Sequence, residues 1–223
     1  MADGKGTRWQ NYNDIPKHFI EINGETLLHR TVRLINEHGG TDEREIDNAH
    51  KAAAGHVING ENEHGVSEYA PTDIVITSHD PRYEVEGARR YEPLNNVLEV
   101  DRFTAELIED DICFLYGDTF YSEETMSAIM DTPVEDMLFF GNQKSIVAVK
   151  IKDGELFRSH VNRVRELFTE GKIKNCKGWQ VYRSFAGLDI GADDYREIRE
   201  KFITVDNKTD DFNTPEDFEK ISK

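Results

Sequence analysis

The chain has 223 residues, which is enough for one well-formed hydrophobic core, and we expect one α/β domain rather than two domains. Its 44 acidic and 27 basic residues give a formal net charge of −17, which argues against general binding to nucleic acids or anionic membranes, because both need a basic surface. Its 2 cysteines provide neither a disulfide framework nor a cysteine-based metal site, and no run of about 18 apolar residues is present, so we expect a soluble cytoplasmic protein.

A glycine-rich segment lies near the start of the sequence. Gly4 and Gly6 flank one residue, and Thr7 and Arg8 follow them. Because glycine tolerates positive φ and close approach, the backbone N–H groups of such a loop can turn inward around a phosphate. Arg8 and Lys17 add one planar cation and one mobile cation, which suit a chain of phosphates. A lone Gly-x-Gly is also typical of an ordinary surface turn, so this pattern alone leaves both interpretations open.

Apolar residues recur at helical spacing over residues 26–38, and two glycines follow them. This pattern predicts a buried amphipathic helix that ends at the glycines. Residues 41–71 are rich in Asp, Glu, His, Asn and Gly, and they predict a polar insertion that acts as a lid or an oligomer contact. The histidines of this insertion do not have the spacing of metal ligands.

Runs of β-branched and aromatic residues predict the buried strands of a sheet. They cover residues 73–78, 111–116, 137–141, 145–151 and 202–205. Helical patterns cover residues 102–109, 122–130 and 155–170. Open α/β sheets bind ligands at the carboxyl ends of their strands. His79 follows the first predicted strand, and Gly117 and Asp118 follow the second, so these residues are candidates for ligand binding.

Further polar residues are candidates for ligand binding. The amides of Asn95 and Asn96 can read the edge of a base, although asparagine is equally an ordinary turn residue. Lys150 is a candidate cation for binding the phosphate group of a small-molecule substrate that accepts a transferred group (the acceptor). The aromatic and basic segment 179–185, with Trp179 and Arg183, suits the wall of an acceptor pocket, and core packing is the alternative interpretation of this segment.

The sequence Asp211-x-Asn-Thr-Pro-Glu-Asp predicts the start of a last helix. Thr214 suits the N-cap, Pro215 the first helical position, and the acidic residues after them the first turn. Asp211 is left without a capping role, which frees it to bind a metal ion. Asp206 and Asp210 are alternative metal ligands, because the sequence fixes the boundary between the last strand and this helix only to within a few residues.

Taken together, the glycine-rich segment with Pro16-Lys17, the Gly117-Asp118 pair and the closing motif resemble the nucleotidylyltransferases that activate sugar phosphates and related phosphorylated alcohols. The resemblance implies an α/β fold of the nucleotide-diphospho-sugar transferase type, a three-layer Rossmann-like mixed, mostly parallel sheet with helices on both faces. It covers residues 1–223 as one nucleotidylyltransferase domain, apart from the insertion. In that family a buried strand precedes the loop, so we expect about five further residues upstream of Met1; the alternative is a divergent member that fills the place of this strand in another way.

The resemblance also implies roles for individual residues. Arg8 and Lys17 would be catalytic, Asp118 and Asp211 would hold Mg²⁺, and Lys150, Trp179 and Arg183 would bind the acceptor. The nucleotide would be bound by Ala2, Asp3, Gly4, Lys5, Gly6, Thr7, Arg8, Lys17, His79, Asn95, Asn96 and Gly117.

The implied reaction joins a nucleoside triphosphate to a phosphorylated small molecule, such as a sugar phosphate, phosphocholine or a phosphonate, and releases pyrophosphate. Such a protein serves cell-surface polysaccharide biosynthesis and needs no nucleic-acid or membrane partner; whether it forms a homodimer is left open. One alternative is a nucleotide-sugar-dependent glycosyltransferase, although Gly117-Asp118-Thr119 lacks the Asp-x-Asp pair that such an enzyme needs. The other alternative is a catalytically silent nucleotide-binding protein of the same fold.

Overall fold

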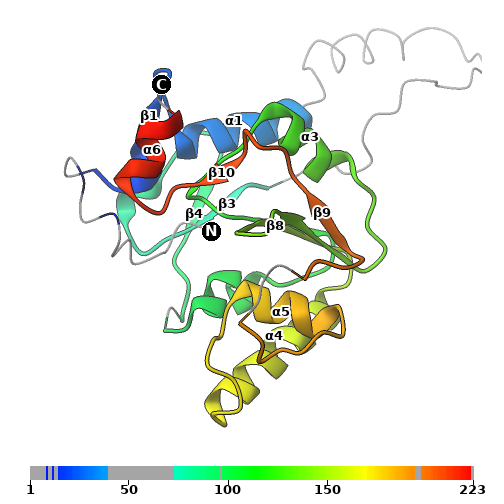
Figure 1. Cartoon of the computed structure of the whole chain (residues 1–223). Coiled ribbons are helices and arrows are strands. Elements are labelled where there is room, and N and C mark those ends of the chain that lie inside the picture. The colour runs from blue at the N-terminus through cyan, green and yellow to red at the C-terminus, as the bar shows by residue number, and fades with distance from the viewer. Residues whose placement is uncertain are drawn as a thin grey trace, which may run out of the picture.

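The computed structural model describes residues 15–39, 73–95, 97–193 and 197–221, together with Trp9 and Tyr12. The predicted loop Ala2–Arg8, the predicted insertion 41–71 and Asn96 lie outside the described residues. The described part is a mixed α/β fold whose sheets are of mixed orientation (Figure 1).

A four-stranded sheet forms the centre of the described structure. Its strands are β5 (Ile112–Leu115), β8 (Ile146–Ile151), β7 (Met137–Gly141) and β9 (Phe202–Thr204), in this spatial order. β8 runs antiparallel to both of its neighbours, whereas β7 and β9 are parallel. The runs of β-branched and aromatic residues predicted all of these strands, and the prediction is confirmed.

The described residues also form three two-stranded sheets. β3 (Val75–Thr77) pairs with β4 (Arg89–Tyr91) in parallel, whereas β1 (Glu21–Ile22) with β2 (Glu25–Thr26) and β6 (Thr119–Phe120) with β10 (Asp210–Asp211) are antiparallel. The β1–β2 hairpin turns at Asn23 and Gly24, whose φ angles of 56° and 82° are those of a tight two-residue turn.

Helices cover both faces of the four-stranded sheet (Figure 1). On one face, α1 (Leu27–Gly39) and α3 (Glu123–Asp131) bury apolar side chains such as Leu34 and Met126 against Phe140 of β7. On the other face, α4 (Gly154–Thr169) and α5 (Gly178–Phe185) form a second core around Phe139 of the same strand. Successive strand residues point to opposite faces, which is why Phe139 and Phe140 serve different cores.

The last helix, α6 (Pro215–Ile221), lies beside the β1–β2 hairpin (Figure 1). Phe212 and Phe218 share an apolar cluster with Ile20 and Ile22 at the other end of the sequence. Pro215 opens the helix as predicted, and the carboxylate of Asp217 accepts a hydrogen bond of 2.9 Å from the Thr214 N–H. The two ends of the described chain therefore pack together.

The start of α3 is capped by a side chain. The Ser122 hydroxyl accepts a hydrogen bond of 3.0 Å from the Thr125 N–H, so Ser122 is the N-cap of this helix. The helix that follows Asp118 in the sequence thus has its own cap, and capping of α3 does not involve the Asp118 carboxylate.

The predicted helix over residues 102–109 is wrong. Two short 3₁₀ segments, η4 (Glu99–Phe103) and η5 (Ala105–Leu107), occupy this stretch and are separated by Thr104 at φ 36°. An α-helix cannot continue through a left-handed residue, and apolar spacing does not report such a break. Among the described residues, η2 (Lys17–Phe19) and η3 (Pro81–Tyr83) are also short 3₁₀ segments.

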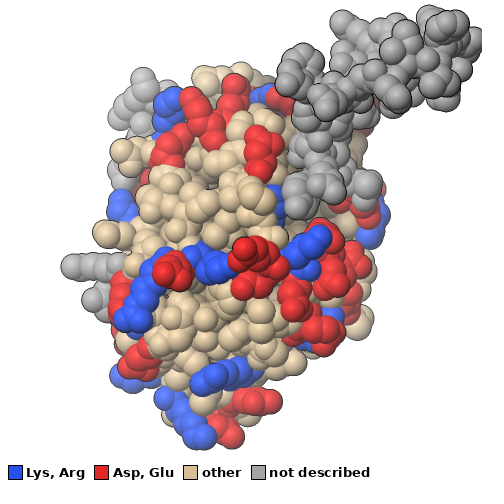
Figure 2. Space-filling view, turned by 90° about the vertical axis from the view of Figure 1, so that its right-hand side faces the viewer, with Lys and Arg blue, Asp and Glu red and all other residues tan. Residues whose placement is uncertain are grey.

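On the face shown in Figure 2, Lys and Arg side chains alternate with Asp and Glu in a band across the molecule. The described cations on this face are thus distributed among acidic neighbours and do not gather into one basic patch. In the described part of the chain, no helix combines the length and apolar character that crossing a bilayer requires.

Candidate active site

The structure brings together Lys17 and Asp118, which are 101 residues apart in the sequence. Lys17 opens η2 immediately after Pro16, and Asp118 lies in the turn between β5 and β6. The Lys17 ammonium donates a hydrogen bond to Oδ2 of Asp118 in an ion pair whose side chains are only 11% and 14% exposed. A cation and a carboxylate predicted to serve one reaction are therefore direct neighbours.

The charge of Asp118 is stabilised by its surroundings. Burial is the largest single influence and raises the pKa of this carboxyl group, but the charge and hydrogen bond of Lys17 outweigh it together with smaller contributions from His18 and Arg102. The net result is a pKa below the usual value, so Asp118 is ionised at neutral pH.

His18 is a buried neighbour of this pair. Burial lowers the pKa of its imidazole to about 3, since the negative charge of Asp118 only partly compensates for the lost hydration. Its Nδ1 lies 2.7 Å from the Tyr83 hydroxyl, and the two rings meet edge to face. At neutral pH His18 is thus an uncharged residue that fixes η2 and thereby the position of Lys17.

Asp211 lies next to Asp118 across the β6–β10 ladder. Asp211 pairs with Thr119 in this ladder, and the Phe212 N–H donates a hydrogen bond of 2.8 Å to the carbonyl oxygen of Asp118. Burial raises the pKa of Asp211, and the nearby charge of Asp118 adds to this increase. The two carboxylates predicted to hold a metal ion are therefore close enough to repel one another.

Two side chains that sequence reasoning missed hold the Asp211 carboxylate. The Ser145 hydroxyl donates a hydrogen bond of 2.7 Å to Oδ1, and the Asn213 amide donates one to Oδ2. Asn213 stands inside the closing motif, two residues after Asp211, and this spacing is the signal that could have identified it. Ser145 precedes β8 as an ordinary polar residue, and the sequence carries no signal for its role.

The alternative metal ligands have other roles in the structure. Asp206 accepts a hydrogen bond of 2.6 Å from the Ser122 hydroxyl through Oδ2, and its Oδ1 accepts from the backbone N–H groups of Lys208 and Thr209. Asp210 accepts from the backbone N–H of Asp211. Asp206 thus ties the loop before β10 to the start of α3, which positions Asp211.

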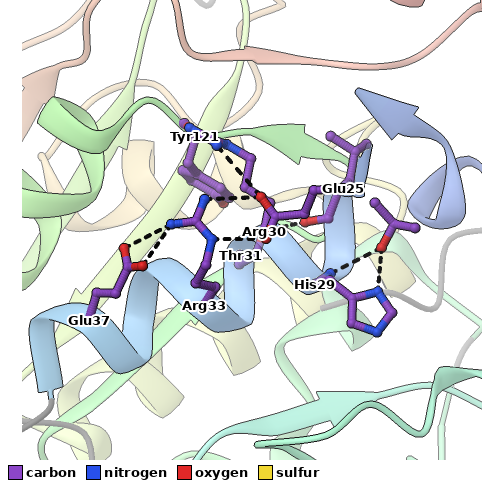
Figure 3. Close-up of polar contacts among 9 residues, drawn as sticks. Glu25, His29, Arg30, Thr31, Arg33, Glu37 and Tyr121 are labelled. Atoms are coloured by element: carbon purple, nitrogen blue, oxygen red, sulfur yellow. Dashed lines mark hydrogen bonds and ion pairs between the residues drawn. The ribbon is translucent and has the colours of Figure 1, made fainter. Parts of the chain in front are cut away.

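Side chains of helix α1 contact β6 and the residue after it (Figure 3). The guanidinium of Arg30 lies 4.6 Å from the centroid of the Phe120 ring, and its Nε donates to the carbonyl oxygen of Tyr121 at 3.2 Å. Arg33 binds Glu25 through two nitrogens and Glu37 through a third. This network fixes α1 against the strand that follows Asp118.

The other predicted residues lie in different surroundings. His79 and Asn95 are exposed, whereas Gly117 is buried. The Lys150 ammonium donates to the carbonyl oxygens of Met130 and Thr132 at the end of α3. Trp179 stacks on Phe202, and Arg183 is 2% exposed and donates to the Asp189 carbonyl. The core-packing interpretation of segment 179–185 is thus confirmed for Trp179, and an acceptor role for these residues stays a prediction.

Replacement of Asp211 by asparagine is expected to stabilise the fold. The folded pKa is raised, so an ionised Asp211 costs stability at neutral pH and asparagine removes that cost. The gain in the free energy of unfolding is complete above the pKa of Asp211 in the folded protein, and it disappears as the pH falls toward the ordinary carboxyl pKa of 3.8. Urea unfolding of both proteins across this pH range measures it, and a variant less stable at pH 7 would contradict the electrostatic account.

No protein-family model matches this chain, and a search of curated proteins finds no match to it.

Proposed function

We propose that the protein is a Mg²⁺-dependent nucleotidylyltransferase, which joins a nucleoside triphosphate to a phosphorylated small molecule and releases pyrophosphate. The observation that carries this proposal is the Lys17–Asp118 ion pair with Asp211 beside it across the β6–β10 ladder. A cation next to two converging carboxylates is the arrangement that handling of a polyphosphate with a divalent metal ion requires.

The donor set fits Mg²⁺. Asp118 and Asp211 supply hard oxygen ligands, and their mutual repulsion means that a divalent cation between them would be bound favourably. Mg²⁺ keeps several water molecules and phosphate oxygens as ligands, so two protein carboxylates are a sufficient donor set for it. When bound, Mg²⁺ would neutralise negative charge on the phosphates.

The residues of the chain then act by position and charge. Lys17 is placed to neutralise a phosphoryl oxygen, and Ser145 and Asn213 keep the Asp211 carboxylate in place. An oxygen of the acceptor phosphate attacks the α-phosphorus in line, the bond to the bridging oxygen of the β-phosphate breaks, and pyrophosphate leaves with that electron pair. A phosphate dianion is already a nucleophile, so the reaction requires no general base. We therefore assign no acid–base role to the buried His18.

We also infer that the sheets belong to one three-layer, Rossmann-like arrangement of the nucleotide-diphospho-sugar transferase type. A cavity of about 600 Å³ is lined by β3 on one side and β5 on the other, with Leu28 and Val32 of α1 along it. One extended strand between β3 and β5 would join the two sheets into a single sheet. Helices on both faces of the four-stranded sheet support the same arrangement (Figure 1).

The test is an assay of pyrophosphate release. The protein is incubated with Mg²⁺ and each of CTP, UTP, GTP, ATP and dTTP, against sugar 1-phosphates, other sugar phosphates, phosphocholine and simple phosphonates. We expect release that depends on the acceptor with one nucleotide. Thermal stabilisation by a nucleotide without any release would instead indicate the silent nucleotide-binding protein, and sugar transfer from a nucleotide sugar would indicate the glycosyltransferase.

A further inference from the structure

The Asp211 carboxylate is held by two hydrogen-bond donors, one on each of its oxygens. The Ser145 hydroxyl donates to Oδ1 at 2.7 Å, and the Asn213 amide donates to Oδ2. Each oxygen has therefore used part of its capacity to accept, and the two contacts together fix the orientation of the carboxylate. Asp211 cannot turn toward an incoming ion without losing one of these charge-assisted hydrogen bonds.

Ser145 belongs to the closed turn that joins β7 to β8. Its N–H donates to Oδ1 of Asn142 at 3.0 Å, and its carbonyl oxygen accepts from the Asn142 N–H at 2.9 Å. The pairing of the two strands shifts register at Gly141, where a Cβ would collide with the Ser145 carbonyl oxygen. Only a glycine lets the turn close this tightly. The Ser145 hydroxyl is thus presented to Asp211 from a fixed backbone.

Asn213 is fixed at the start of α6. Its N–H donates to Oδ2 of Asp217, in the first turn of this helix, at 3.1 Å. The residue before it, Phe212, is fully buried, and its N–H donates to the carbonyl oxygen of Asp118 at 2.8 Å. Asp211 and Asn213 stand on either side of Phe212, so both are held in place relative to Asp118.

A carboxylate held in this way suits one kind of metal ion better than another. Ca²⁺ is often bound by both oxygens of a carboxylate and tolerates irregular geometry, whereas Mg²⁺ demands a near-ideal octahedron and takes single oxygens. Donors that orient a metal ligand from behind strengthen the binding of an ion with strict geometry. With one donor on each oxygen, Asp211 is set to offer one oxygen in one direction, and chelation by both oxygens is disfavoured.

We propose that Ser145 and Asn213 are positioning residues that make the site select Mg²⁺ over Ca²⁺, because they hold Asp211 as a ligand through one oxygen. This inference rests on the proposed function for the presence of a metal ion, but not for the reaction. Ser145 comes from the central sheet and Asn213 from the segment before the last helix, so two separate parts of the fold enforce the same selection. Both residues act through Asp211 and not by contact with the ion.

The test measures metal binding without nucleotide or acceptor. Mn²⁺, which like Mg²⁺ favours octahedral oxygen ligands, is the probe; free Mn²⁺ is followed by electron paramagnetic resonance while Mg²⁺ or Ca²⁺ is titrated as a competitor. We expect wild type to prefer Mg²⁺, and we expect the ratio of the Ca²⁺ Kd to the Mg²⁺ Kd to fall about 10-fold in Ser145→Ala and in Asn213→Ala. Ser145→Thr keeps a hydroxyl and should retain most of the preference.

Matched controls remove similar groups elsewhere. Asn175→Ala deletes an amide that donates to the exposed Asp193 carboxylate at 2.8 Å, and Ser159→Ala deletes an exposed hydroxyl on α4. Both controls should keep the wild-type ratio. Asp211→Asn should lose Mn²⁺ binding, which assigns the resonance signal to this site.

Urea unfolding shows that each variant is folded, and the two alanine variants test the inference independently because they lie in different segments. A wild-type ratio in both variants overturns the selection by Ser145 and Asn213. Mn²⁺ binding that is absent from wild type, or that persists in Asp211→Asn, overturns it as well. If the ratio shifts but no pair of nucleotide and acceptor releases pyrophosphate, the proposed reaction fails and the selection stands; release of pyrophosphate with unchanged ratios has the opposite meaning.

Discussion

Replacement of Asp118 by asparagine is expected to lower the turnover number for pyrophosphate release at least about 10²-fold. Asparagine keeps the shape of the side chain but removes the charge that Asp118 carries at neutral pH, where its pKa lies below the usual value. The variant loses a hard anionic ligand for Mg²⁺ and also the partner that holds the Lys17 ammonium. Turnover is measured with saturating nucleotide and acceptor over a titration of Mg²⁺.

A matched control is Asp131→Asn, which removes the same charge from an exposed position at the end of α3. We expect this control to retain turnover within about 2-fold of wild type, since exposed substitutions away from a site have small effects. Undiminished activity in Asp118→Asn would remove Asp118 from the proposed metal site. A higher Mg²⁺ requirement in Asp118→Asn but not in Asp131→Asn would support a place for Asp118 in the metal site.

The ion pair itself is expected to show a large energetic coupling. Asp118→Leu leaves a largely buried ammonium, and Lys17→Met leaves a largely buried carboxylate, so each change alone should cost about 3 kcal/mol in the free energy of unfolding. The double variant removes both charges and should recover most of that loss, because well-packed apolar side chains can replace an ion pair. Urea unfolding of the four proteins gives the coupling as a double-mutant cycle.

The coupling should depend on pH in a defined direction. The folded pKa of Asp118 is lowered, so its contribution to stability is present above the ordinary value of 3.8 and is lost as the pH falls through the folded pKa. The double variant should lack this acid-dependent loss. Additive single effects at pH 7, with no recovery in the double variant, would contradict a stabilising pair.

Much of the fold could be predicted from the sequence because its signals are local. The strands are short apolar runs between turns, Ser122 caps the start of α3, and Pro215 opens α6, so each of these signals acts within a few positions. The meeting of Lys17, Asp118 and Asp211 was predicted from a motif pattern, and the structure brings them together.

The parts that could not be predicted depend on contacts between distant residues. Ser145 reaches Asp211 across 66 positions of sequence, which no local pattern encodes. The expected helix at 102–109 failed because Asp101 accepts from nearby backbone N–H groups and Thr104 adopts a left-handed conformation, although the apolar spacing allows a helix.

The antiparallel pairing of β6 with β10 also determines when the site can form. β10 contributes Asp211 from near the end of the described chain, whereas β6 follows directly on Asp118. Contacts between such distant segments form late, because the loop between them must close at an entropic cost. During synthesis on the ribosome, the central sheet can begin to assemble before residue 211 has emerged, but the second carboxylate cannot yet be in place. Catalytic competence should therefore appear only after the chain has been completed through β10, and a nascent chain halted earlier should be unable to trap a nucleotide with its metal ion.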